Sequence, residues 1–434
     1  MSQVDSICQQ PPCSTSLDEC TSQQPPYKLL YYCYLPLGQE GRARLVSLLS
    51  RPISPSLSGQ LRIGLDGLNV SLGGPRAALQ AHCALVSSLP EVQASGSAID
   101  FKFAPHLASR SGLPSAAFAA YTVLSVAEIV TLGDAASQVS AASAARHAAP
   151  AEFHALLTGA EASPPHSLLI DVRNAFESAI GTLEPCGGSN LQLLRPQVRR
   201  FEDMVAWTEA HAQELAQAPR IAMFCTGGVR CERFSALLRS RFSGADVVQL
   251  QGGVQRYMEA AEAGALGQGG AAQAEQQQQQ QQQQASRWRG KLYVFDERPA
   301  VAVAGEPLAA AAASPHLPGM LGACVRCRAP HDQYDAGARC SSCRVLVLVC
   351  PPCQALAEGP AAAAAADSVV CDMCSQGVAW ERARTRVRGR KPREARLDLV
   401  QAAAARRAAR EAEGGGQQPA GSEAPPLEAL FEEQ

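Results

Sequence analysis

The chain has 434 residues and a formal net charge of −2, so it is long enough for two or three domains and its overall charge implies no particular partner. Eight of its sixteen cysteines stand in four Cys-x-x-Cys pairs near the C-terminus, which favours metal binding in a reducing compartment over disulfides. No segment is long and apolar enough to span a membrane, and the first residues fit neither a secretory signal nor an Arg-rich transit peptide. We therefore expect a soluble protein with no membrane partner, located in the cytoplasm, with the nucleus as the alternative.

The N-terminal third predicts a small α/β domain after a disordered start. Residues 1–26 are polar and rich in Gln, Ser and Pro, which is typical of disorder. The domain is expected over residues 27–104, followed by a connecting segment, 105–147, with one extended stretch before Gly133. The expected strands and helices are the strand Leu29–Leu35, the helix Arg42–Ser50, a strand pair within Leu61–Leu72 and the helix Arg76–Ser88.

A second α/β domain is predicted over residues 148–262. Ser167–Val172 and Ile221–Phe224 are short apolar runs typical of buried parallel strands, and Val247–Leu250 is a further strand. Phe201–Ala216 has the spacing of one amphipathic helix. Strands that alternate with helices predict right-handed βαβ units in a parallel sheet.

The C-terminal part is expected to consist of linkers around one compact module. A glutamine run makes residues 263–287 a solvated low-complexity linker. An extension and an Ala-rich spacer are expected over residues 288–319. A cysteine-rich module comes next at 320–376, and a basic arm with a disordered tail occupies 377–434.

The run from Cys225 to Glu232, with the sequence Cys-Thr-Gly-Gly-Val-Arg-Cys-Glu, is the most informative stretch. Cys225 stands where a predicted strand ends and a helical pattern begins. Loop N–H groups, the helix N-terminus and the nearby Arg230 would all stabilise a thiolate. We predict Cys225 and Arg230 as catalytic residues; the alternative is a buried structural cysteine. The predicted active-site loop also contains Thr226, Gly227, Gly228 and Val229.

Charged residues at a neighbouring strand end are predicted to support this loop. In an open parallel sheet, reactive loops lie beyond the carboxyl ends of the strands, and Asp171, Arg173 and Glu177 follow such a strand. They would orient the loop or bind an anionic substrate; the alternative is a surface salt bridge. Cys231 would resolve a persulfide or sulfenate on Cys225 as a disulfide, or would pack as a buried thiol beneath the loop.

These segments resemble a rhodanese domain. The resemblance is carried by Asp171-Val172-Arg173-Asn174, by the Cys225 loop and by Leu250-Gln251-Gly252-Gly253-Val254. In that family the loop cysteine carries a persulfide sulfur. The six-residue loop from Cys225 to Arg230 is similar to the sulfurtransferase form, whereas the related dual-specificity phosphatases have one residue more, which disfavours phosphatase chemistry.

A wider resemblance covers about three quarters of the chain. Gly64–Gly74 resembles a glycine and asparagine signature of an acylphosphatase-like α+β domain. Glu128–Gly133 and Pro150–Leu157 resemble a connecting segment, and Val294–Arg298 and Cys324–Asp332 resemble the region that comes after the rhodanese domain. The succession is similar to the tRNA wobble-uridine hydroxylase family, although the glutamine and alanine insertions depart from its pattern. The implied α/β architecture is an acylphosphatase-like domain, a central doubly wound rhodanese sheet and a C-terminal cysteine-rich zinc module.

That resemblance implies a function, and two alternatives stay open beside it. The implied enzyme uses molecular oxygen as co-substrate to hydroxylate C5 of the wobble uridine of tRNA, with Cys225 as its catalytic cysteine. One alternative is a sulfurtransferase that takes sulfur from a small donor such as thiosulfate. The other is a non-catalytic zinc-binding scaffold. The sequence does not name the tRNA, the oxidant chemistry or the oligomeric state.

Four Cys-x-x-Cys knuckles predict two structural zinc ions. Each knuckle offers two thiolates at adjacent corners of a tetrahedron, so eight thiolates suit two zinc sites with four cysteine ligands each. Spacing alone does not pair the knuckles, although interleaving is common, and an iron–sulfur cluster is the alternative. His331 would be a substitute ligand or a plain loop histidine. The predicted ligands are Cys324, Cys327, Cys340, Cys343, Cys350, Cys353, Cys371 and Cys374.

An Arg-rich tract follows the cysteines. A dense block of like charge binds a polyanion or directs nuclear import, and the alternative is a solvated arm. Beside a zinc module, it predicts tRNA binding. The predicted nucleic-acid contacts are Arg384, Arg386, Arg388, Arg390 and Lys391.

Overall fold

The computed structural model describes residues 27–96, 98–105, 118, 120–133, 139–266, 286–293, 300–301, 320–335, 337–358 and 369–377. The predicted N-terminal disorder, most of the predicted linker, most of the Ala-rich spacer and all but the first residue of the basic arm and tail lie outside these residues. Among the described residues, no helix combines the length and apolar character needed to cross a membrane.

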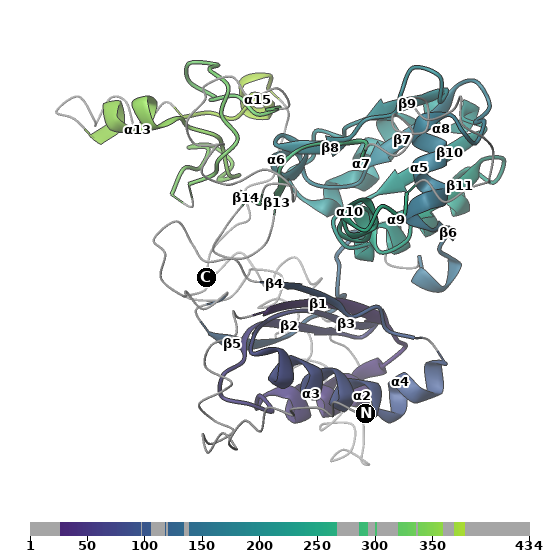
Figure 1. Ribbon diagram of the computed structural model, residues 1–434, viewed down its shortest axis with the longest axis vertical. Coiled ribbons are helices and arrows are strands. Elements are labelled where there is room, and N and C mark those ends of the chain that lie inside the picture. Colours follow the sequence, from purple (N-terminus) through teal and green to yellow (C-terminus); the bar gives the residue numbers. More distant parts are fainter. Residues whose placement is uncertain are drawn as a thin grey trace, which may run out of the picture. The chain divides into compact units, whose positions relative to one another are not determined.

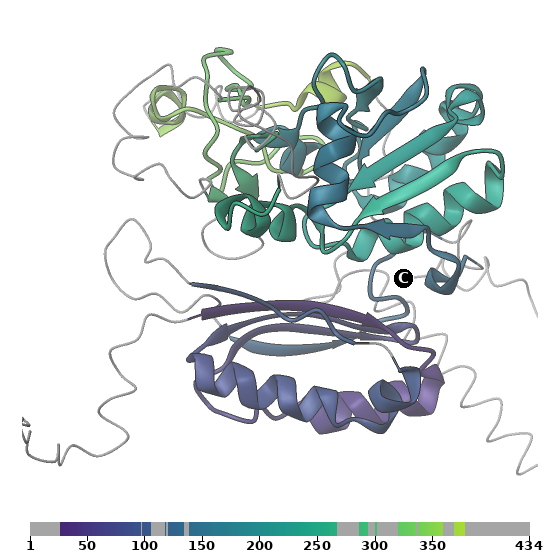
Figure 2. The same ribbon diagram turned by 45° about the vertical axis from the view of Figure 1, so that its right-hand side comes forward.

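The first domain is a five-stranded sheet with its helices on one face (Figures 1 and 2). The strand order is β4-β1-β3-β2-β5, and every pairing is antiparallel except that of β2 with β5. The strands are β1 (Tyr27–Tyr34), β2 (Ser58–Gly64), β3 (Gly67–Gly74), β4 (Lys102–Pro105) and β5 (Tyr121–Ser125). The helices are α2 (Gly38–Leu49), α3 (Arg76–Ser87) and α4 (Pro90–Ser95).

Strand β1 carries apolar or aromatic side chains on both of its faces. Leu29, Tyr31 and Cys33 are buried in the core with residues of α2 and α3. Since successive strand residues point to opposite faces, Tyr32 and Tyr34 lie on the other side of the sheet, where they are half-buried. The second face of this sheet is therefore not a plain solvent face.

One strand of the first sheet comes from the predicted connecting segment. The sequence places Tyr121–Ser125 in that segment, and β5 pairs in parallel with β2. Asp66, in the turn between β2 and β3, accepts a 2.9 Å hydrogen bond from the Ile129 main chain. The chain that leaves the domain is thus tied to its tightest turn.

The central domain is a five-stranded parallel sheet with the order β6-β11-β10-β7-β9. This confirms the predicted parallel α/β architecture. The strands are β6 (Arg146–Ala148), β7 (Ser167–Asp171), β9 (Leu191–Leu194), β10 (Arg220–Phe224) and β11 (Asp246–Leu250). The helices are α5 (Pro150–Thr158), α6 (Ala175–Ser178), α7 (Met204–Ala210), α8 (Ala212–Gln217), α9 (Val229–Arg241) and α10 (Gly253–Glu262).

Strand β10 is buried on both faces, as expected for a sheet covered on both sides. Ile221 and Met223 pack with residues of α7, α8 and α9, whereas Ala222 and Phe224 pack with residues of α5 and α10. The hydrophobic effect acting on the two layers fixes the register, because a one-residue slip would exchange them. The carboxyl end of β10, where Cys225 follows, is held between two packed layers.

The helix predicted over Phe201–Ala216 is divided. A 3-10 turn (η4, Phe201–Asp203) leads into α7, and His211 separates α7 from α8. His211 has left the helical conformation, with φ −110° and ψ 16°, and its ring stacks on Trp207 at 4.4 Å. A ring contact at the end of α7 accompanies the break that periodicity alone did not indicate.

The C-terminal part adds short elements to this domain. β12 (Trp288–Gly290) pairs with β8 (Gly181–Leu183), and β13 (Leu292–Tyr293) pairs with β14 (Ala300–Val301). The cysteine-rich segment contains the short helices α13 (Pro351–Glu358) and α15 (Asp372–Ser375).

Candidate active site around Cys225

The Cys225 sulfur lies in a loop between β10 and α9. The cysteine is fully buried, and its sulfur accepts a 3.1 Å hydrogen bond from the Gly228 main-chain N–H. Helix α9 begins at Val229, so its positive end lies beside the loop. Sequence and structure therefore agree on the strand-to-helix position of Cys225.

Charge and hydrogen bonds around the sulfur favour the thiolate. Burial opposes ionisation, but the Cys231 thiol, the Arg230 charge and the main-chain N–H groups of both residues outweigh it and lower the pKa of Cys225 to about 5. At neutral pH such a thiol is about 99 % ionised. The loop thus holds a ready nucleophile.

Cys231 has the opposite character. Burial and the neighbouring Cys225 anion raise the pKa of the Cys231 thiol well above its usual value. The two sulfurs are partners in one hydrogen bond, with Cys231 as the protonated member. This arrangement brings the predicted resolving thiol next to Cys225, and it also buries that thiol beneath the loop.

The Arg230 guanidinium binds the Glu177 carboxylate rather than water. Two hydrogen bonds of 2.5 and 2.8 Å join the guanidinium to the carboxylate, which is itself fully buried. Thr226 closes the group, since its hydroxyl donates to Glu177 at 3.2 Å and accepts from Arg230 at 3.1 Å. Glu177 therefore fixes both ends of the six-residue loop.

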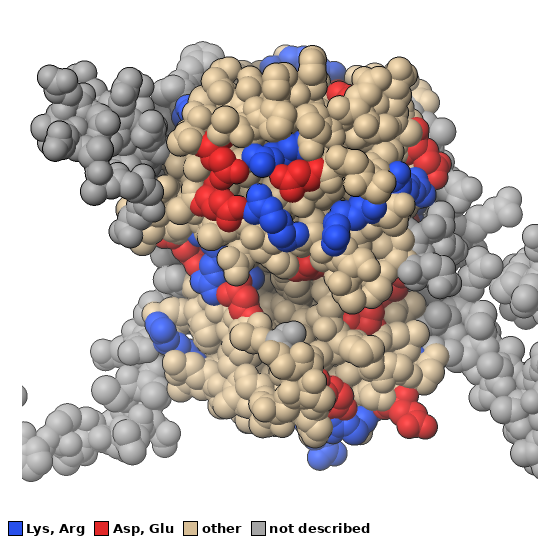
Figure 3. All heavy atoms as spheres, turned by 90° about the vertical axis from the view of Figure 1, so that its right-hand side faces the viewer, with Lys and Arg blue, Asp and Glu red and all other residues tan. Residues whose placement is uncertain are grey.

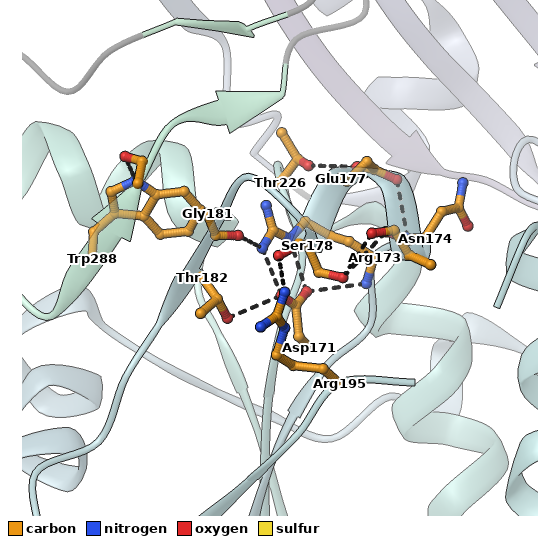
Figure 4. A network of polar contacts seen from close by, with 12 residues as sticks. Asp171, Arg173, Asn174, Glu177, Ser178, Gly181, Thr182, Arg195, Thr226 and Trp288 are labelled. Carbon is orange, nitrogen blue, oxygen red and sulfur yellow. Dashed lines mark hydrogen bonds and ion pairs between the residues drawn. The ribbon is translucent and has the colours of Figure 1, made fainter. Parts of the chain in front are cut away.

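Asp171 and Arg173 form a separate buried pair (Figure 4). Two hydrogen bonds of 2.8 and 2.6 Å join them, and both side chains have no exposed surface. Arg173 also stacks on Trp288, 5.1 Å from the ring centroid, and Thr182 donates to Asp171 at 3.2 Å. The pair is not a surface salt bridge, and its described hydrogen bonds go to each other, to Thr182 and to Gly181 rather than to the Cys225 loop.

Glycines of two loops allow the backbones to approach closely. Gly228 has φ +103°, and a Cβ there would lie 2.7 Å from the Tyr32 hydroxyl. Gly253 has φ +68°, and a Cβ there would lie 2.6 Å from the carbonyl oxygens of Cys225 and Thr226. Side chains at either position would displace the Cys225 loop.

Two tyrosines of the first domain also contact this loop, and the sequence did not predict them as site residues. The Tyr32 hydroxyl donates to Glu232 at 2.9 Å, and the Tyr34 hydroxyl donates to the Val229 carbonyl at 2.9 Å. Glu232 also accepts from His147 at 2.9 Å. The sequence of β1 contains a signal for these contacts. It has large side chains on both faces of the strand, as is typical of a strand that is covered on both sides.

The eight cysteines form two groups, each of which could hold a metal ion. Within each group the four sulfurs lie within 4.8 Å of one another. The first knuckle joins the third and the second joins the fourth, so the arrangement is interleaved. The groups are Cys324, Cys327, Cys350 and Cys353, and Cys340, Cys343, Cys371 and Cys374.

The backbone around the tetrads has the geometry of metal knuckles. Arg328 follows Cys327 and Arg344 follows Cys343, which is the second cysteine of its knuckle in each case. Both arginines have a left-handed backbone conformation, with φ +62° and +66°. The Cys350 and Cys371 N–H groups donate to the sulfurs of Cys324 and Cys340 at 3.4 and 3.3 Å. Four thiolates with main-chain donors suit a closed tetrahedral metal site. His331 belongs to neither group.

The cysteine-rich module contacts the helix that carries Glu177. The Tyr334 hydroxyl donates to the Phe176 carbonyl at 2.7 Å, and the rings of Phe176, Tyr293 and Tyr334 form edge-to-face contacts. Arg199 of the central domain donates to the Cys374 sulfur at 3.5 Å. The module therefore packs on α6, whose Glu177 binds Arg230 of the Cys225 loop.

The predicted nucleic-acid contacts, Arg384 to Lys391, lie outside the described residues. On the face shown in Figure 3, Lys and Arg side chains lie among Asp and Glu side chains rather than in one continuous basic field.

Comparisons with known proteins identify the family. A family model described as Rhodanase C-terminal matches residues 289–376. The tRNA uridine(34) hydroxylase of Synechococcus sp. (strain CC9902) is 31 % identical over 321 residues, which cover 72 % of this chain and 90 % of that protein. The chain belongs to the tRNA uridine(34) hydroxylase family. The family resemblance drawn from the succession of segments along the chain is thereby confirmed.

Other relatives differ in extent. The tRNA uridine(34) hydroxylase of Jannaschia sp. (strain CCS1) is 31 % identical over 66 % of this chain and 79 % of its own length. Rhodanese-like domain-containing protein 6 of Arabidopsis thaliana is 29 % identical over 80 % of this chain, which spans about half (52 %) of that protein. A solved structure, the BLUF protein BlrB in its dark state, aligns with 24 % of this chain at 20 % identity and a TM-score of 0.19, too low to support an argument.

Proposed function

We propose that this member of the hydroxylase family hydroxylates C5 of the wobble uridine of tRNA in an oxygen-dependent reaction, with Cys225 as catalytic cysteine. The single observation that carries the proposal is the Cys225 loop, in which the buried sulfur accepts a hydrogen bond from the Gly228 N–H beside the start of α9 and the pKa of the thiol is lowered to about 5. The names of the relatives supply the substrate class. Molecular oxygen, tRNA and the catalytic roles of the loop residues are part of the proposal.

The roles within the loop follow from their contacts. Arg230 stabilises the thiolate by its charge, and Glu177 positions Arg230 through two hydrogen bonds. Thr226, Gly227, Gly228 and Val229 provide the backbone around the sulfur. Asp171 and Arg173 act further out, as a buried pair that shapes the turn leading to Glu177.

Nucleoside mass spectrometry tests this function. We expect tRNA from cells lacking the gene to lose wobble 5-hydroxyuridine, the parent gene to restore it and Cys225→Ala not to. Cys83→Ala is the matched control, because Cys83 belongs to α3 and packs against the core of the first domain. Restoration by Cys225→Ala would refute the catalytic role.

A sulfurtransferase is the second candidate, because the six-residue loop suits a persulfide. In that reaction the Cys225 thiolate would attack the outer sulfur of thiosulfate, forming a sulfur–sulfur bond while sulfite leaves with the bonding electrons. Thiosulfate:cyanide activity with unchanged tRNA nucleosides would favour this candidate. Absence of both activities in a folded protein would favour the non-catalytic scaffold.

We also propose that both cysteine tetrads hold structural zinc. Tetrahedral thiolate groups without an open position are typical of structural zinc sites, and their metal contributes directly to folding. Metal analysis is expected to find about two zinc ions per chain. A chelator is expected to unfold residues 320–376, measured by proteolysis; iron in the purified protein would favour a cluster instead.

The basic arm is proposed to bind tRNA. Arg384, Arg386, Arg388, Arg390 and Lys391 would neutralise phosphates, so that binding weakens steeply as salt rises. Replacing all five by Gln should reduce both the affinity for tRNA and its salt slope. A salt-independent affinity of the parent protein would contradict this role.

A further inference from the structure

Lys102, the first residue of β4, is a buried cation that the proposed loop chemistry leaves unused. Its side chain has no exposed surface, and its ammonium lies 2.7 Å from an Asp100 carboxylate oxygen. An ammonium has three donors, and among the described residues Asp100 is the one carboxylate that pairs with it. Burying a charge whose donors are incompletely paired costs free energy of folding. We therefore asked what function the buried ammonium serves.

The strand register places Lys102 on the face that packs against the Cys225 loop. Lys102 pairs directly with Leu30 of β1, and directly paired strand residues share one face. A Cβ on Gly227 would lie 3.0 Å from the Leu30 side chain, so Leu30 packs on the loop. The Lys102 ammonium also lies 5.5 Å from the ring centroid of Tyr32, whose hydroxyl reaches Gly228.

The partner of Lys102 is anchored from the central domain. Asp100 also pairs with Arg256 of α10, and Arg256 donates to the Phe101 carbonyl at 3.0 Å. Helix α10 begins at Gly253, which packs on the carbonyl oxygens of the catalytic loop. The ammonium is therefore fixed between two elements that both contact this loop.

We propose that Lys102 is an active-site residue supplied by the first domain. Its ammonium holds a negatively charged atom at the Cys225 sulfur, either the thiolate or the outer sulfur or oxygen of an anionic group that reacts with it. The inference rests on the proposed role of Cys225. It adds a cation on the side of the sulfur that faces the first domain, whereas Arg230 is committed to Glu177 and Thr226.

The electrostatics agree with this placement. The pKa of Lys102 is lowered overall, because burial and the Arg256 charge outweigh Asp100 and the Cys225 thiolate, which raise it. The other charged or titratable groups around the thiolate are Arg230 and Cys231 of α9, Glu177 of α6, Glu232 beside Cys231, and Tyr32 and Tyr34 of β1. Lys102 is thus the cation that β4 adds to this set.

Charge-selective alkylation of the full chain tests the role. Iodoacetate and iodoacetamide react alike, forming a carbon–sulfur bond as iodide leaves, but only iodoacetate is an anion. Trypsin cuts after Arg220 and Arg230, so Cys225 is read on the peptide Ile221–Arg230, separate from Cys231. We expect Lys102→Met to lower the iodoacetate-to-iodoacetamide rate ratio at Cys225 by roughly 3- to 10-fold, because one nearby positive charge is lost.

Two controls separate charge from folding. Lys102→Arg should keep most of the ratio. Lys291→Met removes a comparable lysine, paired with Asp332 at 2.8 Å, and should leave the ratio unchanged. General loosening of the fold would change the two rates together and not their ratio.

The outcomes distinguish this inference from the proposed function. An unchanged ratio in Lys102→Met, with Cys225 still reactive, overturns the role of Lys102 alone. A parent Cys225 that titrates as an ordinary thiol overturns the proposed function. If neither reagent reaches Cys225, the ultraviolet thiolate absorbance that Cys225→Ser removes gives the same decision: its pKa must rise in Lys102→Met, and no rise overturns the inference.

Discussion

At the scale of single residues, the buried ion pair of Glu177 and Arg230 fixes the conformation of the Cys225 loop. Glu177 is fully buried and both of its oxygens bind Arg230, while the main-chain N–H of Asn174 donates to the same carboxylate at 3.1 Å. Removing one member of a buried pair leaves the other charge uncompensated. The pair therefore couples the stability of the fold to the position of the cation beside Cys225.

Glu177→Ala is expected to destabilise the protein by about 3–5 kcal/mol, as is typical when a buried ion pair is broken. Urea denaturation measures the change. Glu152→Ala is the control, because its exposed pair with Arg146 contributes about 1 kcal/mol or less. Equal effects of the two substitutions would contradict the importance of the Glu177 pair.

Cys231→Ser separates the two interpretations of Cys231. If the Cys231 thiol resolves a sulfenate or persulfide on Cys225, the variant should retain the added oxygen or sulfur on Cys225. It should form no disulfide between residues 225 and 231. Intact-mass measurement after thiosulfate or peroxide treatment detects the adduct. Turnover equal to that of the parent protein would remove the resolving role and leave Cys231 as a packed thiol.

At the scale of elements, the conformation of the Cys225 loop depends on its glycines. Gly228→Ala would place a methyl group 2.7 Å from the Tyr32 hydroxyl at φ +103°, so it should displace the N–H that binds the Cys225 sulfur. We expect a rise of about one unit in the pKa of Cys225, which lowers the alkylation rate at pH 4 roughly tenfold and leaves the rate at pH 7 almost unchanged. Gly244→Ala, at a position with nothing within 4 Å, should have no effect.

The sequence predicted the elements of this site more fully than their surroundings. Apolar runs and the glycine-rich motif were sufficient to place Cys225 between β10 and α9, because these signals are local. Periodicity did not show the break at His211, since the ring stacking on Trp207 that accompanies it involves side-chain geometry. It also left β5 outside the first sheet, because strand pairing is a long-range contact.

The missed residues belong to contacts between distant parts of the chain. Tyr32 meets Glu232 across 200 positions, and no local pattern pairs them. Only the two-sided character of β1 suggested that its second face is covered. The interleaved pairing of the cysteine knuckles likewise required the fold, because spacing permits other pairings.

At the scale of the whole molecule, a fully buried Cys225 implies that its cover must open for a large substrate. The loop glycines pack against Leu30 and Tyr32 of the first domain. An enzyme that acts on a nucleobase takes the base into its own pocket. A uridine could reach the sulfur only after these contacts separate.

Arg233 is the polar contact best placed to test this opening. Its side chain is 4 % exposed and pairs with Asp66 at 3.3 Å and with Glu128 at 2.9 Å. Arg233→Ala should raise the rate of Cys225 alkylation several-fold, because a contact that keeps the sulfur covered is lost. Arg241→Ala, which removes an exposed pair with Glu209, should leave the rate unchanged. A slower or equal rate in Arg233→Ala would contradict this cover.

The pH dependence of iodoacetamide incorporation into Cys225 tests the central claim most directly. The thiolate is the reacting species, so the rate should rise with pH through a midpoint of about 5 and stay level across neutral pH. The peptide Ile221–Arg230 reports this cysteine alone among the sixteen. A midpoint near the ordinary thiol value of 9.0 would contradict the account, because Cys225 would then be largely protonated where the enzyme is proposed to act.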